Sequence, residues 1–103
     1  MLAAASALSV KNASVVIVNP THLACALRYD AESGDEAPVV VASGEGYVAQ
    51  QIVRAARDYG VQIIENVSLA RALRELEIGD SIPEALYETV AEVLREILDQ
   101  ADG

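Results

Sequence analysis

Cysteine and large aromatic side chains are nearly absent from this sequence. Its 103 residues include no Trp, no Phe, four Tyr and one Cys. A single cysteine excludes an intrachain disulfide and gives no sign of an oxidising compartment. Because hydrophobic residues still make up 52% of the chain, the core must consist of Val, Leu, Ile and Ala. A chain of this length can bury such a core as one small domain.

Basic residues are also scarce. Seven Lys and Arg stand against 16 Asp and Glu, which gives a formal charge of -9, and the basic residues form no cluster along the chain. Binding to nucleic acid or to an anionic membrane surface needs clustered cations that neutralise phosphates. The composition therefore excludes nucleic acid as a partner.

Ligands for a metal or a cofactor are missing as well. His22 and Cys25 are the only residues of their types, and no pair has the spacing of a zinc site. Cys25 lies in an apolar run, which predicts a buried and inert thiol. The glycine-bearing segment 43–46 has no lysine, and Glu45 would repel an anion, so it does not match a phosphate-binding loop. We expect no cofactor and no metal.

Long hydrophobic segments are the last absence. The longest apolar runs fall well short of the ~20 residues that a membrane-spanning helix needs. Residues 2–8 are Ala-rich but lack the cationic start of a signal peptide. The sequence predicts no membrane segment in this chain.

The remaining pattern predicts an α/β domain. Residues 1–12 are expected to form a lead-in helix or linker, and residues 13–103 the domain itself. Apolar, β-branched runs predict strands, and 3.6-residue periodicity predicts helices. The expected strands are 14–18, 23–29, 39–42 and 61–65, and the expected helices are 47–59, 68–76 and 82–100.

Turn and cap signals set the expected boundaries of these helices. Residues 43–46 predict the turn before the first long helix, and Gly60 its end. Ser68 is the expected N-cap of the second helix. Ser81 and Glu84 have capping-box spacing, which predicts that the last helix begins there.

An acidic ridge follows along the last helix. Its members recur every four residues, so they share one face, and they are Glu84, Glu88, Glu92 and Glu96. A solvated helix face is the simpler interpretation, and a docking surface for a basic partner is the alternative.

The most informative stretch is Asn19-Pro20-Thr21-His22, which separates the first two apolar runs. Asn-Pro is first of all a turn signal. Ordinary deamidation of Asn19 is blocked because Pro20 has no N–H to attack the side chain. The Asn19 side-chain nitrogen can instead attack its own main-chain carbonyl carbon, which would form a succinimide and expel Pro20. This chemistry would cut the chain between Asn19 and Pro20.

The neighbouring residues suggest how such a cut could be assisted. Pro20 biases Asn19 toward extended conformations. His22 is close enough in a tight turn to accept or relay a proton. Thr21 could hydrogen-bond across the turn and hold its shape. These roles for Asn19, Pro20, Thr21 and His22 are hypotheses based on spacing.

Residues 15–22 (VVIVNPTH), 26–29 (ALRY) and 37–42 (APVVVA) resemble the cytoplasmic domain of the FlhB/YscU family. Residues 69–73 (LARAL) and 90–94 (VAEVL) extend the match in order and spacing, so that the resemblance covers about Ala13 to Leu98. Members of this family are export-apparatus switch proteins of the bacterial flagellum and of type III secretion systems.

The resemblance implies an activity and a fold. Family members cleave themselves between the residues that correspond to Asn19 and Pro20, and the fragments stay together. The implied fold is a mixed, mostly parallel four-stranded sheet wrapped by about four helices. Cleavage is a single intramolecular event that switches export from early to late substrates, so the domain is not a turnover enzyme.

The resemblance also implies partners and a location. The expected partners are other export-apparatus proteins, a secreted ruler protein and the secretion substrates, at the cytoplasmic face of the bacterial inner membrane. Full-length family members are membrane-anchored. Ser43, Gln62 and Arg74 depart from residues that are common in the family. An excised domain and a free-standing homologue both fit the sequence, and an uncleaved protein-binding module is the alternative function.

Overall fold

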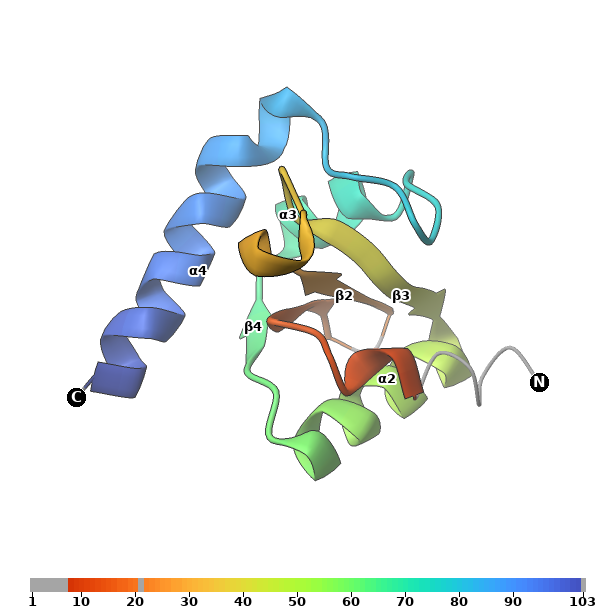
Figure 1. Ribbon diagram of the computed structural model, residues 1–103. Helices are drawn as coiled ribbons and strands as arrows, with labels where there is room; N and C mark the ends of the chain where they lie inside the picture. Colours follow the sequence, from red (N-terminus) through yellow and green to blue (C-terminus); the bar gives the residue numbers. More distant parts are fainter. Residues whose placement is uncertain (1–7, 21, 103) are drawn as a thin grey trace.

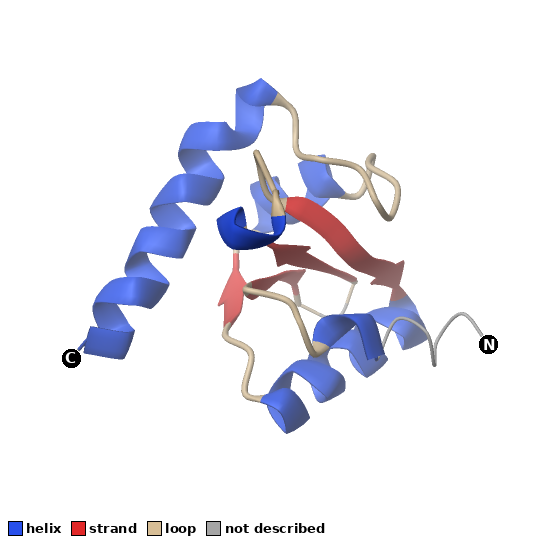
Figure 2. Cartoon of the chain, viewed as in Figure 1, coloured by secondary structure: helices blue, strands red, loops and turns tan. Residues whose placement is uncertain are grey.

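A four-stranded sheet forms the centre of the computed structural model, which describes residues 8–20 and 22–102. The strand order is β3-β2-β1-β4, and helices cover both faces of the sheet (Figure 1, Figure 2). The strands are β1 (Val15–Asn19), β2 (Leu23–Arg28), β3 (Val39–Glu45) and β4 (Ile63–Glu65).

The helices divide between the two faces of the sheet. Helix α2 (Gly46–Tyr59) packs on one face, and α3 (Val67–Leu73) and α4 (Tyr87–Asp102) pack on the other. Residues 8–10 are also helical, and Val10 is fully buried on the α2 side. Two short 3-10 helices, η1 (Ala31–Ser33) and η2 (Glu84–Leu86), lie in the connections. The predicted α/β class, with a mixed four-stranded sheet and about four helices, is confirmed.

The strand directions differ from the expectation of a mostly parallel sheet. Strand β2 is antiparallel to both β1 and β3, and only β1 and β4 run parallel. The physical reason is the short connection from Asn19 to Leu23, since a tight turn can join only antiparallel neighbours. The expectation of a mostly parallel sheet was wrong.

Strand β1 is buried on both faces of the sheet. Val15 and Ile17 belong to the hydrophobic cluster under α3 and α4, and Val16 and Val18 to the cluster under α2. Successive side chains of a strand point to opposite faces, so a run of four apolar residues satisfies both clusters at once. Strand β1 therefore packs against the α2 cluster on one face and the α3 and α4 cluster on the other, and it pairs with β2 and β4 at its two edges.

Strand β3 continues through the segment that was expected to be a turn. Ser43, Gly44 and Glu45 pair with β2, and α2 begins directly at Gly46, whose φ is 54°. Gly44 is needed for a close approach, because an added Cβ would collide with the Val48 side chain. The predicted turn at 43–46 was wrong; Gly60 does end α2, in a left-handed conformation.

Two predicted helix starts were also wrong. The N-cap of α3 is Asn66, whose side chain accepts a hydrogen bond from the Leu69 N–H, and not Ser68. The capping box at Ser81 does not form, because Ser81 makes a β-bridge with Val39. The backbone stays extended until η2, and α4 begins at Tyr87.

The lead-in prediction extends beyond the residues that the structure describes. Residues 1–7 lie outside them, and so does Thr21. The boundary at residue 13 between lead-in and domain stays a prediction.

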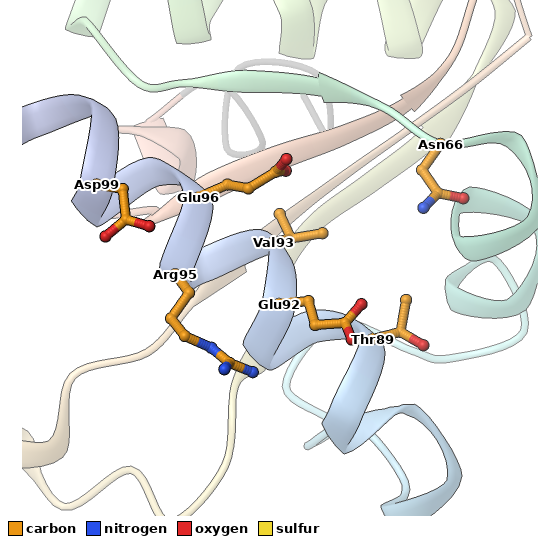
Figure 3. A pocket seen from close by; sticks show the side chains of 7 residues that line it. All are labelled: Asn66, Thr89, Glu92, Val93, Arg95, Glu96 and Asp99. Atoms are coloured by element: carbon orange, nitrogen blue, oxygen red, sulfur yellow. The ribbon is translucent and has the colours of Figure 1, made fainter.

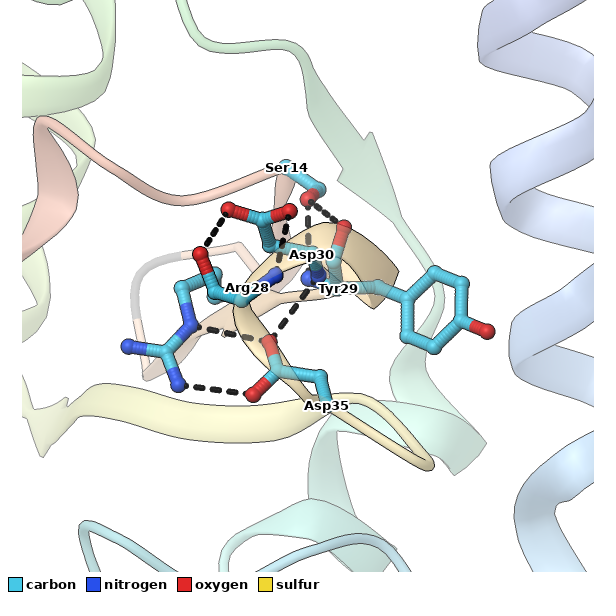
Figure 4. A network of polar contacts seen from close by, with 6 residues as sticks. Ser14, Arg28, Tyr29, Asp30 and Asp35 are labelled. Atoms are coloured by element: carbon cyan, nitrogen blue, oxygen red, sulfur yellow. Dashed lines mark hydrogen bonds and ion pairs between the residues drawn. The ribbon is translucent and has the colours of Figure 1, made fainter.

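A polar network fastens the loop between β2 and β3 (Figure 4). Asp35 accepts hydrogen bonds from Arg28 Nε at 3.0 Å, from Arg28 Nη2 at 2.9 Å and from the Asp30 N–H at 2.9 Å. The Arg28 guanidinium, followed by the Asp30 N–H, lowers the pKa of Asp35 below its ordinary value. Ser14 Oγ accepts from the Tyr29 N–H at 3.0 Å. The network holds the ends of β1 and β2 that lie opposite the Asn19 turn.

Candidate functional site

The residues singled out from the sequence lie in the turn between the two central strands. Asn19 is the last residue of β1 and is half-buried, opposite Leu23 of β2. Pro20 and His22 are exposed. The His22 N–H donates a hydrogen bond to the Asn19 carbonyl oxygen at 3.0 Å. This bond closes a tight turn around the Asn19–Pro20 peptide bond.

Backbone hydrogen bonds fix the surroundings of this turn. On one side the Asn66 N–H donates to the Val18 carbonyl oxygen at 3.0 Å, and on the other the Gly46 N–H donates to the His22 carbonyl oxygen at 3.1 Å. Strand β1 is already held by β2 and β4. Asn19 therefore enters the turn from a rigid element, which limits the conformations open to its backbone.

One backbone donor already faces the Asn19 carbonyl oxygen. A tetrahedral intermediate carries its negative charge on the carbonyl oxygen, and donors 2.7–3.1 Å from that oxygen stabilise it. The His22 N–H already donates to this oxygen from 3.0 Å. The structure thus supplies one backbone donor that the sequence reasoning did not foresee, since that reasoning assigned His22 only a side-chain role.

A surface pocket of about 390 Å³ adjoins the turn. Asn19 of β1, His22 of the turn and Leu23 of β2 line it on one side, and Glu45 and Gly46 line it from the junction of β3 and α2. Its remaining lining residues are Arg71 and Arg74. Two of the predicted site residues, Asn19 and His22, therefore line the same pocket. Pro20 is exposed and does not line it.

Two arginines bring positive charge to this pocket. Arg71 lies in the last turn of α3, and Arg74 is the C-cap of that helix. Arg74 Nε forms an ion pair with Glu45 Oε1 at 2.9 Å, in which both side chains are more than half exposed. The sequence reasoning missed Arg71 and Arg74 as site residues. Their i, i+3 spacing predicts a shared helix face, but only the packing of α3 shows that this face meets the turn.

Cys25 behaves as the sequence predicts. It is a free and buried cysteine in β2, and burial raises the pKa of its thiol to about 12. The thiol therefore stays protonated at neutral pH and is not a nucleophile. Among the residues that the structure describes, no group of three His, Cys, Asp or Glu side chains could hold a metal ion.

The acidic ridge borders a different pocket from the one that Asn19 lines. Glu88, Glu92 and Glu96 are exposed on α4 as expected, whereas Glu84 belongs to η2. A second pocket, of about 440 Å³, lies beside this face (Figure 3). It is lined by Asn66, Thr89, Glu92, Val93, Arg95, Glu96 and Asp99. Docking of a basic partner on this ridge stays a prediction.

None of the described helices combines the length and the hydrophobicity that crossing a membrane requires.

Comparisons with known proteins agree on one family. The model of the FlhB HrpN YscU SpaS family matches residues 1–97. The flagellar biosynthetic protein FlhB of Aquifex aeolicus is 46% identical over 90 residues, which cover 86% of this chain and 25% of that protein. The Bacillus subtilis protein YlqH is 50% identical over 74 residues, which cover 72% of this chain and 78% of YlqH. The chain thus spans about a quarter of the length of the FlhB relative.

Solved structures of the same family share the fold. The cytoplasmic domain of FlhB from Shewanella putrefaciens superimposes with a TM-score of 0.85 at 37% identity, over 90% of this chain and 71% of that one. A mutated EscU C-terminal domain gives 0.82 at 33% identity, over 86% of this chain and 89% of that one. This chain therefore belongs to the FlhB HrpN YscU SpaS family of export-apparatus proteins, and its fold is that of their C-terminal cytoplasmic domains.

Proposed function

We propose that this chain is a self-cleaving switch domain of a flagellar or type III secretion export apparatus, cut between Asn19 and Pro20. The observation that carries the proposal is the turn at the end of β1. There the Asn19 carbonyl oxygen already accepts the His22 N–H at 3.0 Å, and the following Pro20 cannot support deamidation. Membership of the export-apparatus family supplies the cellular context.

The first step is attack by Asn19 Nδ2 on the main-chain carbonyl carbon of Asn19. A carbon–nitrogen bond forms, and the carbonyl oxygen takes the negative charge. The His22 N–H stabilises this oxyanion, and the rigid end of β1 keeps the reacting atoms close together. The amide nitrogen loses a proton in this step, for which the His22 imidazole in the same pocket is the candidate acceptor.

The second step is loss of Pro20. The bond between the Asn19 carbonyl carbon and the Pro20 nitrogen breaks, and a proton is transferred to that nitrogen. The products are a C-terminal succinimide at Asn19 and a free amine at Pro20. Thr21 retains the shape-holding role proposed from the sequence. Each chain reacts once, so the domain is an autoprocessing module and not a turnover enzyme.

The cut fragments are expected to stay together. Val15, Val16, Ile17 and Val18 have exposed fractions of at most 9%, and β1 has a hydrogen-bonded neighbour on each side. Full burial of each such side chain stabilises by roughly 1.5–3 kcal/mol. Four of them, with two strand ladders, can retain residues 1–19 without a covalent link.

In the export apparatus this cut would change which substrates are accepted. The proposed partners are other export proteins, a secreted ruler protein and the secretion substrates, and the proposed location is the cytoplasmic face of the bacterial inner membrane. The alternative is a protein-binding module of the same machinery that acts uncut through its surface.

Intact-mass analysis of the purified protein tests the proposal. After incubation at mildly alkaline pH we expect two species, residues 1–19 and 20–103, which co-elute under native conditions. Asn19→Ala removes the nucleophile and should stay whole. Asn12→Ala, which changes an exposed Asn outside the turn, is the matched control and should be cut like the wild type. A wild-type chain that stays uncut would overturn the proposal and favour the uncut module.

A further inference from the structure

The pocket beside Asn19 concentrates positive charge on a strongly acidic protein. The chain has a formal charge of -9 and only seven basic residues. Two of them, Arg71 and Arg74, line this pocket together with His22, the only histidine of the chain. The single acidic residue in the lining is Glu45. The pocket therefore has one more guanidinium than carboxylate.

The two arginines differ in what they bind. Arg74 is paired with Glu45, but both side chains are exposed by more than half, so this pair exchanges easily with solvent or with another carboxylate. Arg71 has no ion-pair partner among the described residues. A guanidinium presents a planar fork of donors that matches a carboxylate. A carboxylate is therefore the ligand that these two exposed guanidinium groups match best.

We propose that the pocket lined by Arg71 and Arg74 is the binding site for the carboxylate that cleavage creates at residue 19. The inference rests on the proposed function, and it assigns the two arginines a role after the cut. Before the cut, position 19 offers the pocket only a neutral amide. After it, the same residue, still held in β1, carries one negative charge.

The chemistry supplies this charge whichever way the succinimide opens. Water adds to one of the two ring carbonyl carbons, the bond from that carbon to the ring nitrogen breaks, and the nitrogen takes up a proton. Attack at the main-chain carbon leaves an α-carboxylate and the side-chain amide. Attack at the side-chain carbon leaves a side-chain carboxylate and a main-chain amide. Both routes consume one water and place one carboxylate at residue 19.

Capture of this carboxylate would separate the two new ends. Residue 19 lines the pocket, whereas Pro20 is exposed and does not line it. The arginines would hold the carboxylate at the end of β1 and repel the new ammonium group of Pro20. The first fragment gains an attachment that the uncut chain lacks, and the second gains a free N-terminus.

A first experiment tests the pocket without cleavage. Asn19→Asp places a carboxyl group at position 19 at nearly constant shape, and NMR titration measures its pKa. We expect a pKa below the ordinary Asp value of 3.8. Arg71→Gln combined with Arg74→Gln should return the pKa to that ordinary value. Arg54→Gln with Arg57→Gln removes the same charge from exposed positions of α2 and should leave the lowered pKa in place. An ordinary pKa in Asn19→Asp, or an equal rise in both double variants, would overturn the inference.

A second experiment uses the cut protein. Exchange of an isotope-labelled 1–19 fragment against excess unlabelled fragment gives its release rate. Removing both pocket arginines should speed release about threefold to tenfold, as expected for a solvent-exposed charge-assisted contact. Arg71→Lys with Arg74→Lys keeps the charge and should recover part of the effect. Carboxylate capture would be contradicted if loss of both pocket arginines left the release rate unchanged. It would also be contradicted if the Arg54→Gln, Arg57→Gln control released the fragment equally fast.

The two experiments distinguish failure of the inference from failure of the proposed function. If the wild type stays uncut, the proposed function fails, and the first experiment still decides whether the pocket binds a carboxylate at position 19. If the wild type is cut but neither experiment depends on Arg71 and Arg74, only the inference fails. Unfolding by urea of each variant in the uncut Asn19→Ala background checks that the domain still folds.

Discussion

Shortening the Ile17 side chain should weaken the association of residues 1–19 with the rest of the cut domain, and the loss should grow with the number of atoms removed. Ile17 is fully buried in the cluster under α3 and α4, and it lies in the middle of β1 with Cys25 on one side and Ile64 on the other. Loss of one buried methylene costs about 0.5–1.5 kcal/mol, and truncation to Ala about 2–5 kcal/mol. Because Ile17 packs against and pairs with residues beyond the cut, this loss should weaken the association of residues 1–19 with the rest of the domain.

The free energies convert into expected affinities. A loss of about 1 kcal/mol in Ile17→Val weakens fragment binding about fivefold, and a loss of about 3 kcal/mol in Ile17→Ala weakens it about a hundredfold. Fragment exchange in the cut protein measures the affinity, and urea unfolding of the same substitutions in the uncut Asn19→Ala background measures the stability. The two losses should agree for each substitution.

The control lies in the same fragment. Asn12→Ala changes an exposed residue and should shift either quantity by less than about 0.5 kcal/mol. If Ile17→Ala left fragment affinity unchanged while lowering the stability of the uncut domain, burial of β1 would not be what holds the fragments together.

Three further predictions follow from His22, Cys25 and Asp35. His22→Ala should slow cleavage by roughly 10²–10⁴-fold with little change in urea stability, since His22 is exposed; an unchanged rate by intact mass would remove its side chain from the mechanism. Burial raises the pKa of Cys25 from 9.0 to about 12. The thiol therefore deprotonates first in the unfolded chain, and the free energy of unfolding should fall as pH rises from 9 toward 12. Urea unfolding of Cys25→Ala at several pH values should lack this decrease. Arg28 lowers the pKa of Asp35, so Asp35 stabilises the fold above its ordinary pKa of 3.8, and this contribution is lost on acidification. By urea unfolding, Asp35→Asn should be less stable than the wild type at neutral pH. A loss of stability that persisted unchanged in acid would argue against the ion pair.

Local patterns predicted the elements whose signal lies within a few residues. The β-branched run before Asn19 is a central strand, and the apolar stripes of α2, α3 and α4 face the core. Gly60 ends α2 because its left-handed φ of 73° favours glycine at that point.

Long-range pairing explains the predictions that were wrong. Gly44 suggested a turn, but β2 pairs with that segment and extends β3 to Glu45. Ser81 had the spacing of a cap, but Val39 holds it in a β-bridge. A sequence window contains neither partner, so local propensity loses to contacts with distant strands.

The same distinction applies to the candidate site. Asn19, Pro20 and His22 lie within four consecutive residues, and their chemistry can be inferred from the residue types and the order alone. Arg71 and Arg74 reach the turn only because α3 packs against β1 and β2. The turn could therefore be predicted from the sequence, and the charged pocket beside it could not.

The mass of the first fragment tests the central claim most directly. Attack by the Asn19 side chain leaves a succinimide, so the earliest fragment 1–19 should be one water lighter than the same peptide ending in a free acid, and should gain that water with time. Mass spectrometry of a freshly purified, acid-quenched sample would detect both species. A fragment that carries the free acid from its first appearance, or a chain that stays whole, would contradict cleavage by Asn19 cyclisation.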